Sequence, residues 1–275
     1  MVNADDMGLT AGVCRAVRRA HGEGVVTSTS VLAVGSAFEE AAATVRDAGG
    51  LALGAHLAIV GEDRPLLSAA EVPTLVDRDG RFPLSYRTVV ARGAAGRLDP
   101  ADVAREFRVQ LERIRGIGVP VTHLDTHQHT HLWPAVAGVV VELARESGIG
   151  AVRLPGSARS GPLGTGVRLL AGRLRRRLGR DGLATTDGYA GLDEAGGMDD
   201  ARFAAALQRL TGSAARTAEV NVHPGEDGDP DLARFAWGGY RWGEELAMLT
   251  APGTRALVES QGWRLGTFAD VAGTR

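Results

Sequence analysis

Residues 119–134, VPVTHLDTHQHTHLWP, join a short apolar strand signal to a dense cluster of histidines. Four of the seven histidines in the chain lie here with Asp125 among them: His123, His127, His129 and His131. In an extended segment these five side chains would share one face. Burying so many polar groups on one face is costly without a partner. A divalent metal ion is such a partner, and the alternative is a histidine-rich surface loop that binds metal adventitiously.

Outward from this stretch, short apolar segments alternate with longer amphipathic ones. The strand-like segments are 29–34, 51–56, 119–125, 151–154, 219–223 and 264–268, and the helix-like segments are 11–23, 36–48, 100–116, 134–147, 199–212 and 243–261. Helix 100–116 is the clearest, because Asp99 and Pro100 form a start signal and Val103, Phe107 and Leu111 share a face with Ile114. This alternation predicts an α/β fold with a parallel sheet or barrel and helices outside.

Polar residues follow the predicted strands at their carboxyl ends, where such folds build their sites. The residues concerned are Asp5, Asp6, His56, Asp125, His127, Arg153 and His223. A closed or nearly closed barrel would bring them together. The first strand looks like a stub, Val2 and Asn3, so we expect the natural start to lie upstream of Met1.

The chain of 275 residues reads as one domain over 1–275, with excursions over the barrel mouth at about 60–98 and 156–198. Its formal net charge of −2 gives no reason to expect a nucleic-acid partner. No apolar run is long enough for a membrane helix and no secretory signal is present, so we expect a cytoplasmic protein. Cys14 is the only cysteine, which excludes an internal disulfide. All basic residues are arginine, which excludes lysine Schiff bases and the P-loop lysine.

The adjacent carboxylates Asp5 and Asp6 suit a metal hydrolase. One can ligate a metal ion while its neighbour reaches the water bound to that ion, the arrangement for general-base activation. Alone, a pair of aspartates is usually a surface turn. His56 could equally be a hydrogen-bonded core histidine, Arg153 a loop brace and His223 a turn residue, so their shared placement at strand ends carries the argument.

Residues 167–180, VRLLAGRLRRRLGR, form a basic amphipathic segment. Val167, Leu170, Leu174 and Leu178 share a helical face, and six arginines cover much of the rest. Such a segment can lie on an anionic membrane surface or meet a lipid-bearing substrate. The alternative, which we favour, is a surface helix with a solvated basic face.

Several motifs, in order along nearly the whole chain, resemble the YdjC-like carbohydrate deacetylase family, which includes chitooligosaccharide deacetylases and hopanoid-biosynthesis-associated deacetylases. They are VNADDMGLT, VTSTSVLA, LALGAHL, THLDTHQHTHLWP, VHPGE and RLGTFADV. The resemblance implies a distorted TIM-like (β/α) barrel, one divalent metal ion, Zn²⁺ or Mg²⁺, and hydrolysis of an N-acetyl group from an amino sugar.

The resemblance also implies roles for individual residues. Asp6, His56 and His127 would bind the metal ion, Asp5 would be the general base, and His223 the acid that protonates the leaving amine. By analogy with polysaccharide deacetylases, Arg153 would orient Asp5 and keep it ionised. Asp125 would hold a ligand histidine. His123, His129 and His131 would support the ligands or contact substrate. Trp133 could stack on a sugar ring, or be a core tryptophan.

The segment 182–207 is more similar to the hopanoid-associated branch, which favours a lipid-linked glucosamine as substrate and a membrane contact through 167–180. An N-acetylglucosaminyl group on another aglycone is the alternative. We also expect a homo-oligomer, although no residue pattern derives one. The rival functions are a metal-dependent amidohydrolase or phosphoesterase, and a non-catalytic sugar-binding protein. An amidohydrolase often carries an HxH motif on its first strand, where this chain has Asn-Ala-Asp-Asp.

Overall fold

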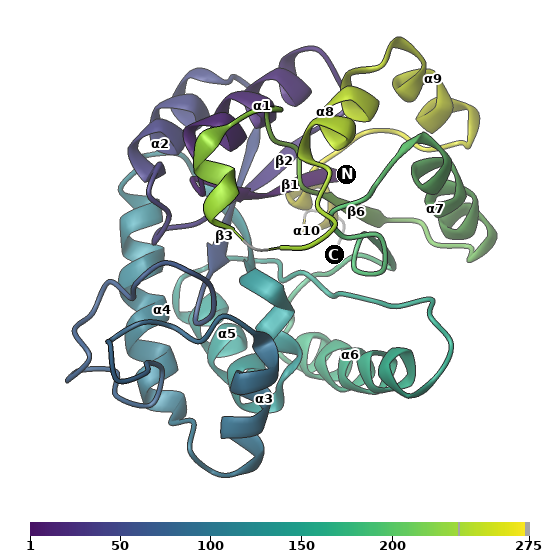
Figure 1. The fold of residues 1–275 in the computed structure, drawn as a ribbon. Coiled ribbons are helices and arrows are strands. Elements are labelled where there is room, and N and C mark those ends of the chain that lie inside the picture. Colours follow the sequence, from purple (N-terminus) through teal and green to yellow (C-terminus); the bar gives the residue numbers. More distant parts are fainter. Residues whose placement is uncertain (236, 273–275) are drawn as a thin grey trace.

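Six parallel strands form one curled sheet at the centre of the fold (Figure 1). A computed structural model of the chain describes residues 1–235 and 237–272. The strands are β1 (Val2–Met7), β2 (Ser28–Val31), β3 (Ala52–Leu57), β4 (Val121–Thr126), β5 (Gly188–Ala190) and β6 (Ala218–Val222). Their order is β4-β3-β2-β1-β6-β5, and isolated bridges continue past β4, from Leu124 to Val152 and from Ala151 to Ala184. This curled parallel sheet confirms the predicted α/β fold of the distorted TIM-like barrel type.

Helices cover the outer side of the sheet (Figure 1). Five of them lie where the sequence predicts: α1 (Ala11–Gly22), α2 (Phe38–Asp47), α4 (Pro100–Arg115), α5 (Pro134–Glu146) and α7 (Asp200–Gly212). The helix predicted over 243–261 is two helices, α8 (Trp242–Thr250) and α9 (Pro252–Ser260), because Pro252 has no backbone N–H to continue α8. A short α10 (Phe268–Ala272) ends the described chain.

Helix α4 shows how local signals and packing agree. The Asp99 side chain accepts a hydrogen bond from the backbone N–H of Ala101, and Pro100 occupies the first turn. The predicted apolar face of Val103, Phe107 and its partners is buried. It packs α4 between β3 and α5, on the side of the barrel that carries the histidine stretch.

Two helices lie in the predicted excursions: α3 (Tyr86–Ala94) within 60–98 and α6 (Pro162–Arg180) within 156–198. Leu174 and Leu178 of α6 are buried, as the predicted amphipathic face requires. The division of the chain into one domain with these two excursions stays a prediction. Over the described residues, none of the helices combines the length and apolar character needed to cross a bilayer.

Three strand predictions are wrong. The first strand is no stub, because β1 runs from Val2 to Met7 and includes the acidic pair. Residues 151–154 form only isolated bridges and are cut short by Pro155 and Gly156, which do not continue a sheet. Residues 264–268 form no strand, since Phe268 begins α10 and Asp270 accepts a hydrogen bond from the Thr267 N–H.

Candidate active site

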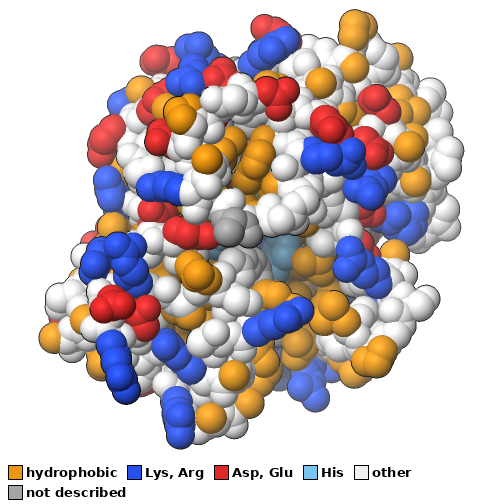
Figure 2. All heavy atoms as spheres, viewed as in Figure 1, with side chains coloured by type: hydrophobic (Ala, Val, Ile, Leu, Met, Phe, Trp, Pro, Cys, Tyr) orange, Lys and Arg blue, Asp and Glu red, His pale blue; other side chains and the backbone are white. Residues whose placement is uncertain are grey.

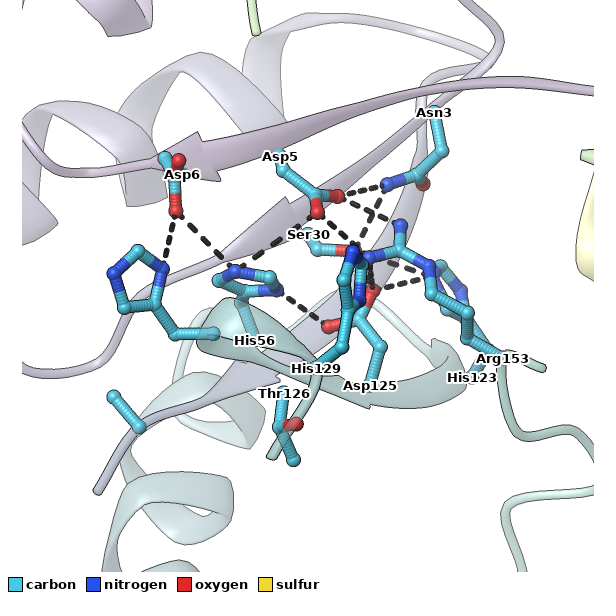
Figure 3. A network of polar contacts seen from close by, with 12 residues as sticks. Asn3, Asp5, Asp6, Ser30, His56, His123, Asp125, Thr126, His129 and Arg153 are labelled. Atoms are coloured by element: carbon cyan, nitrogen blue, oxygen red, sulfur yellow. Dashed lines mark hydrogen bonds and ion pairs between the residues drawn. The ribbon is translucent and has the colours of Figure 1, made fainter. Parts of the chain in front are cut away.

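The interior of the curled sheet is polar (Figure 3). Asn3 and Asp5 of β1, Ser30 of β2 and Asp125 of β4 are all buried there, together with His56, His123 and Glu219. The parallel register places His56 beside Asp125 and Ala4 beside Val222, and Asp5 and His223 are the next residues along these two segments. The sheet thus brings together residues separated by more than two hundred positions in the chain, as the strand-end reasoning predicts.

A bulge in β1 lets adjacent carboxylates serve one site. The pairing of β1 with β2 shifts between Ala4 and Met7, and Asp6 has a φ of 60°. That left-handed conformation is costly for a residue other than glycine and is typical of functional sites. In a regular strand Asp5 and Asp6 would face opposite sides. Here both carboxylates approach His56 Nε2, Asp6 Oδ1 at 3.2 Å and Asp5 Oδ2 at 3.9 Å.

Asp6, His56 and His127 form a group of three potential metal donors. Their donor atoms lie within 4.8 Å of one another, and His127 Nδ1 is 2.9 Å from Asp6 Oδ1. The other ring nitrogen of His56 is held by Asp125 Oδ1 at 2.6 Å, which fixes the ring and points Nε2 at Asp6. A carboxylate behind a ligand histidine is a common feature of metal sites.

The charges around these donors favour a cation. Burial alone would raise the pKa of Asp6, but the charge and hydrogen bond of His127, with those of His56, hold it well below its usual range. Burial alone would lower the pKa of His56, but the charges of Asp125 and Asp5 and the hydrogen bonds that His56 donates to Asp125 and Asp6 raise it to about 10. The site thus draws a proton onto His56, and a divalent ion among the same atoms would displace it.

A second possible donor group, Asp5, His56 and Asp125, fits a metal ion less well. Arg153 already binds Asp5 through both carboxylate oxygens, at 2.6 and 2.7 Å, and Asp125 at 2.9 Å. Its side chain is fully buried, and its Nε donates to Glu219 at 2.8 Å. Burial disfavours its charge, yet Asp125, Asp5 and Glu219 raise the pKa of Arg153 well above its usual range. Arg153 therefore fixes the position of the Asp5 carboxylate, the contact that the resemblance implies.

Two small residues, Ser30 and Gly54, position His123 beside Asp125. Ser30 donates to Asp125 Oδ2 at 2.6 Å and lies 3.2 Å from His123 Nε2. The His123 ring stacks on Phe268, with 3.9 Å between ring centroids. Gly54 leaves the space for that ring, since a Cβ there would lie 2.2 Å from His123 Cε1. His123 therefore supports Asp125 and stays remote from the donor group that includes His127.

The histidine stretch does not stay extended. Strand β4 ends at Thr126, and η1 (His127–Leu132) follows as a 3₁₀ turn, with Gln128 and His129 left-handed at φ of 50° and 53°. The turn sends His127 to Asp6 and takes His129 and His131 away from that group. His131 bonds to Thr126 Oγ1 at 2.7 Å and His129 lies 3.3 Å from the Tyr189 hydroxyl. The common face expected for an extended segment is therefore not formed.

His223 follows β6 and is held by its backbone. Its N–H donates to Glu245 Oε2 at 2.6 Å, and its ring lies 5.4 Å from that of Tyr240. Among the described residues its buried Nδ1 has no hydrogen-bond partner. Burial raises the pKa of Glu245, and the charge of His223 opposes that rise.

Aromatic residues differ most from expectation. Trp133 lies away from the donor group, over Gly93 of α3, where it lines an apolar pocket. The ring that approaches His127 is Trp237, at 5.3 Å between centroids, and its Nε1 donates to Glu62 Oε1 at 2.9 Å. Trp237, Glu219 and Glu245 were not anticipated as site residues. Of these three, only Glu219 could have been found from the sequence, because it shares one face of the predicted strand 219–223 with His223.

Known proteins with this sequence pattern carry consistent names. The profile of the family described as YdjC-like protein matches residues 1–260. A carbohydrate deacetylase of Geobacillus stearothermophilus is 32% identical over 270 residues, covering 98% of this chain and 96% of the relative. A chitooligosaccharide deacetylase of Klebsiella pneumoniae (strain 342) is 32% identical over 275 residues, covering 98% of both.

The fold has a counterpart among solved structures. A crystal structure of a provisionally named cellobiose-phosphate cleavage protein from Enterococcus faecalis V583 superposes with a TM-score of 0.80 at 25% identity, covering 98% of this chain and 97% of that one. The full-length match of the family profile and the coverage of these relatives agree with the motifs around Asp6 and His127. The chain belongs to the YdjC-like protein family.

Proposed function

We propose that the protein is a metal-dependent hydrolase that removes the N-acetyl group from an N-acetylglucosamine-type amino sugar and releases acetate. The observation that carries the proposal is the convergence of Asp6, His56 and His127 beside the ion pair of Asp5 with Arg153. The relatives named as carbohydrate and chitooligosaccharide deacetylases support the substrate class.

One divalent ion, Zn²⁺ or Mg²⁺, would be held by Asp6, His56 and His127. When bound, such an ion acts as a Lewis acid toward a carbonyl group and makes water a better nucleophile. The donor set fits this role, because two imidazoles and one carboxylate with room for further ligands are typical of catalytic sites. Among the described residues, the surplus of buried carboxylates over one buried arginine, Arg153, also favours a divalent cation.

The residues around the donors supply acid and base. Asp5 would take the proton from the attacking water as the new carbon–oxygen bond forms. Arg153 donates two hydrogen bonds to Asp5 and would orient it for this role. His223 would protonate the amine nitrogen as the carbon–nitrogen bond breaks, since an unprotonated amine is a poor leaving group. Asp125 would hold His56 in the tautomer that presents Nε2.

The form of the substrate is the less constrained part of the proposal. A lipid-linked glucosamine, as in the hopanoid-associated branch, or another aglycone fits the sequence. A membrane contact through 167–180 remains a prediction. Arg168 and Arg175 donate to backbone carbonyls within the protein, so the free basic face is smaller than the sequence indicates.

The test is acetate release. Protein stripped of metal and then reloaded with Zn²⁺ or Mg²⁺ is incubated with methyl N-acetylglucosaminide, and the release of acetate and ammonia is measured. Cleavage of a phosphate-ester substrate is measured in parallel. Acetate that depends on reloading supports the proposal. Ammonia release or phosphoester cleavage instead would favour the rival hydrolases. Binding of sugar without any turnover would favour a non-catalytic binding protein.

A further inference from the structure

The two excursions enclose an apolar groove beside the candidate active site. Its volume is about 430 Å³, within the range of small-molecule sites. Helix α3 contributes Val89 and Val90, and α6 contributes Leu163, Val167 and Leu170. We call it the α3–α6 groove. Figure 2 shows hydrophobic side chains gathered in this part of the face, below the histidine visible in the central hollow.

Several polar groups on the walls of the α3–α6 groove are paired within the protein, and two that have no partner among the described residues, His129 Nδ1 and Thr130 Oγ1, are themselves buried. The Gln128 amide accepts from the Tyr86 N–H and donates to the Leu84 carbonyl, both at 2.9 Å. Ser157 donates to Asp193 at 2.8 Å, and Arg159 donates to the Asp193 carbonyl at 2.6 Å. A second sugar in the groove would lose hydrogen bonds to water that these walls do not replace. Hydrocarbon would lose none.

The groove and the active site share the η1 segment. His127 faces Asp6, and His129, two residues later, lines the groove. Two residues span at most about 7 Å of chain, so this wall of the groove lies about one sugar ring from His127 along the backbone. The left-handed conformations of Gln128 and His129 turn one short segment toward both places. Strain of this kind persists where the surroundings hold it and marks functional turns.

We propose that the α3–α6 groove is the aglycone subsite, and that it selects an N-acetyl amino sugar carrying an apolar alkyl group over one carrying a second sugar. The inference rests on the proposed function, since the amino sugar itself must occupy the site at Asp6 and His127. It separates this chain from the chitooligosaccharides in the names of its relatives.

The groove offers a matched pair of variants. Leu163 and Leu169 lie on the same helix and are similarly exposed, 59% and 64%, but only Leu163 lines the groove. A charge at either position is accessible to water, so both variants are expected to fold. Leu163→Asp places a carboxylate where the hydrocarbon would bind, and Leu169→Asp is its control.

Acetate release is compared for octyl and methyl N-acetylglucosaminides and for N,N′-diacetylchitobiose, with the octyl compound below its micelle-forming concentration. Each buried methylene improves binding about fourfold, so we expect kcat/KM for the octyl compound to exceed that for the methyl compound by about tenfold or more in the unmodified protein. The ratio should fall to about threefold or less in Leu163→Asp and stay unchanged in Leu169→Asp.

Equal values for the two glycosides, or a preference for diacetylchitobiose, would overturn the subsite. So would an octyl preference that Leu163→Asp and Leu169→Asp leave equally intact. Calorimetric titration with octyl N-acetylglucosaminide separates this failure from that of the proposed function. Binding that weakens about tenfold in Leu163→Asp, with no acetate from any compound, would retain the groove as a binding site and reject the hydrolase.

Discussion

Replacement of Arg153 by methionine tests the buried charge network that positions Asp5. Methionine fills much of the same space but removes the cation that contacts Asp5, Asp125 and Glu219. Removing one partner from a buried ion pair costs about 3–5 kcal/mol, because the other charge stays desolvated. Since three carboxylates lose their partner at once, we expect Arg153→Met to lower the free energy of unfolding by at least about 3 kcal/mol.

The loss should depend on pH in a definite direction. Burial would raise the pKa of Asp125, but Arg153 and His56 hold it well below its usual range. A carboxyl group whose pKa is lowered in the folded state stabilises the protein at pH values above its unfolded-state pKa of about 3.9. That contribution is lost as the pH falls through the folded-state pKa. Without Arg153, burial raises the pKa of Asp125 and Glu219, so these carboxylates destabilise the fold at neutral pH and the penalty falls as they protonate. The deficit should therefore be larger at about pH 7.5 than at about pH 5.

Equilibrium urea unfolding, followed by tryptophan fluorescence, measures the effect. Arg108→Met is the control, because Arg108 and Glu146 are each 46% exposed and such a surface pair contributes less than about 1 kcal/mol. Adding Glu219→Gln to Arg153→Met should recover about 1–2 kcal/mol by neutralising one of the stranded carboxylates. A deficit no larger than that of the control, or one that grows as the pH falls, would refute the reasoning.

Three further outcomes are expected. Asp5→Asn should retain bound metal by elemental analysis while turnover falls about 10²–10⁴-fold; full activity would remove Asp5 from the role of base. His127→Ala should lose bound metal while His129→Ala keeps it, because of these two histidines His127 is the one that contacts Asp6; the reverse result would reassign the ligand. Burial raises the pKa of the Cys14 thiol to about 12, so a thiol reagent should label it only on unfolding, and rapid labelling of the folded protein would contradict this.

Much of the framework follows from periodicity and from strand-end placement. The face of α4 and the meeting of Asp5, His56 and Asp125 required only the alternation of strands with helices and the rule that parallel strands end together. The motifs carry the assignment of Asp6 and His127 as neighbours, because they lie 121 positions apart. No local pattern connects residues at that separation.

The remaining features depend on backbone conformation that a single sequence does not specify. Parity predicts one face for His127 and His129, but two left-handed residues break the extended run at the end of β4. Likewise, Asp6 reaches the same site as Asp5 only because β1 bulges. Trp237 comes to His127 from a loop after the last strand, and loop paths are set by tertiary contacts such as its bond to Glu62.

The bridged segment beside β4 has a consequence beyond catalysis. The Leu124 N–H donates to the Ala151 carbonyl, and the Leu124 carbonyl accepts from the Arg153 N–H. These bonds use backbone groups that an open sheet edge would offer to a strand of another molecule. The segment 151–153, which positions Arg153, therefore also protects the edge of the sheet from intermolecular strand pairing. A substitution that weakens these bonds is expected to lower solubility as well as disturb the site.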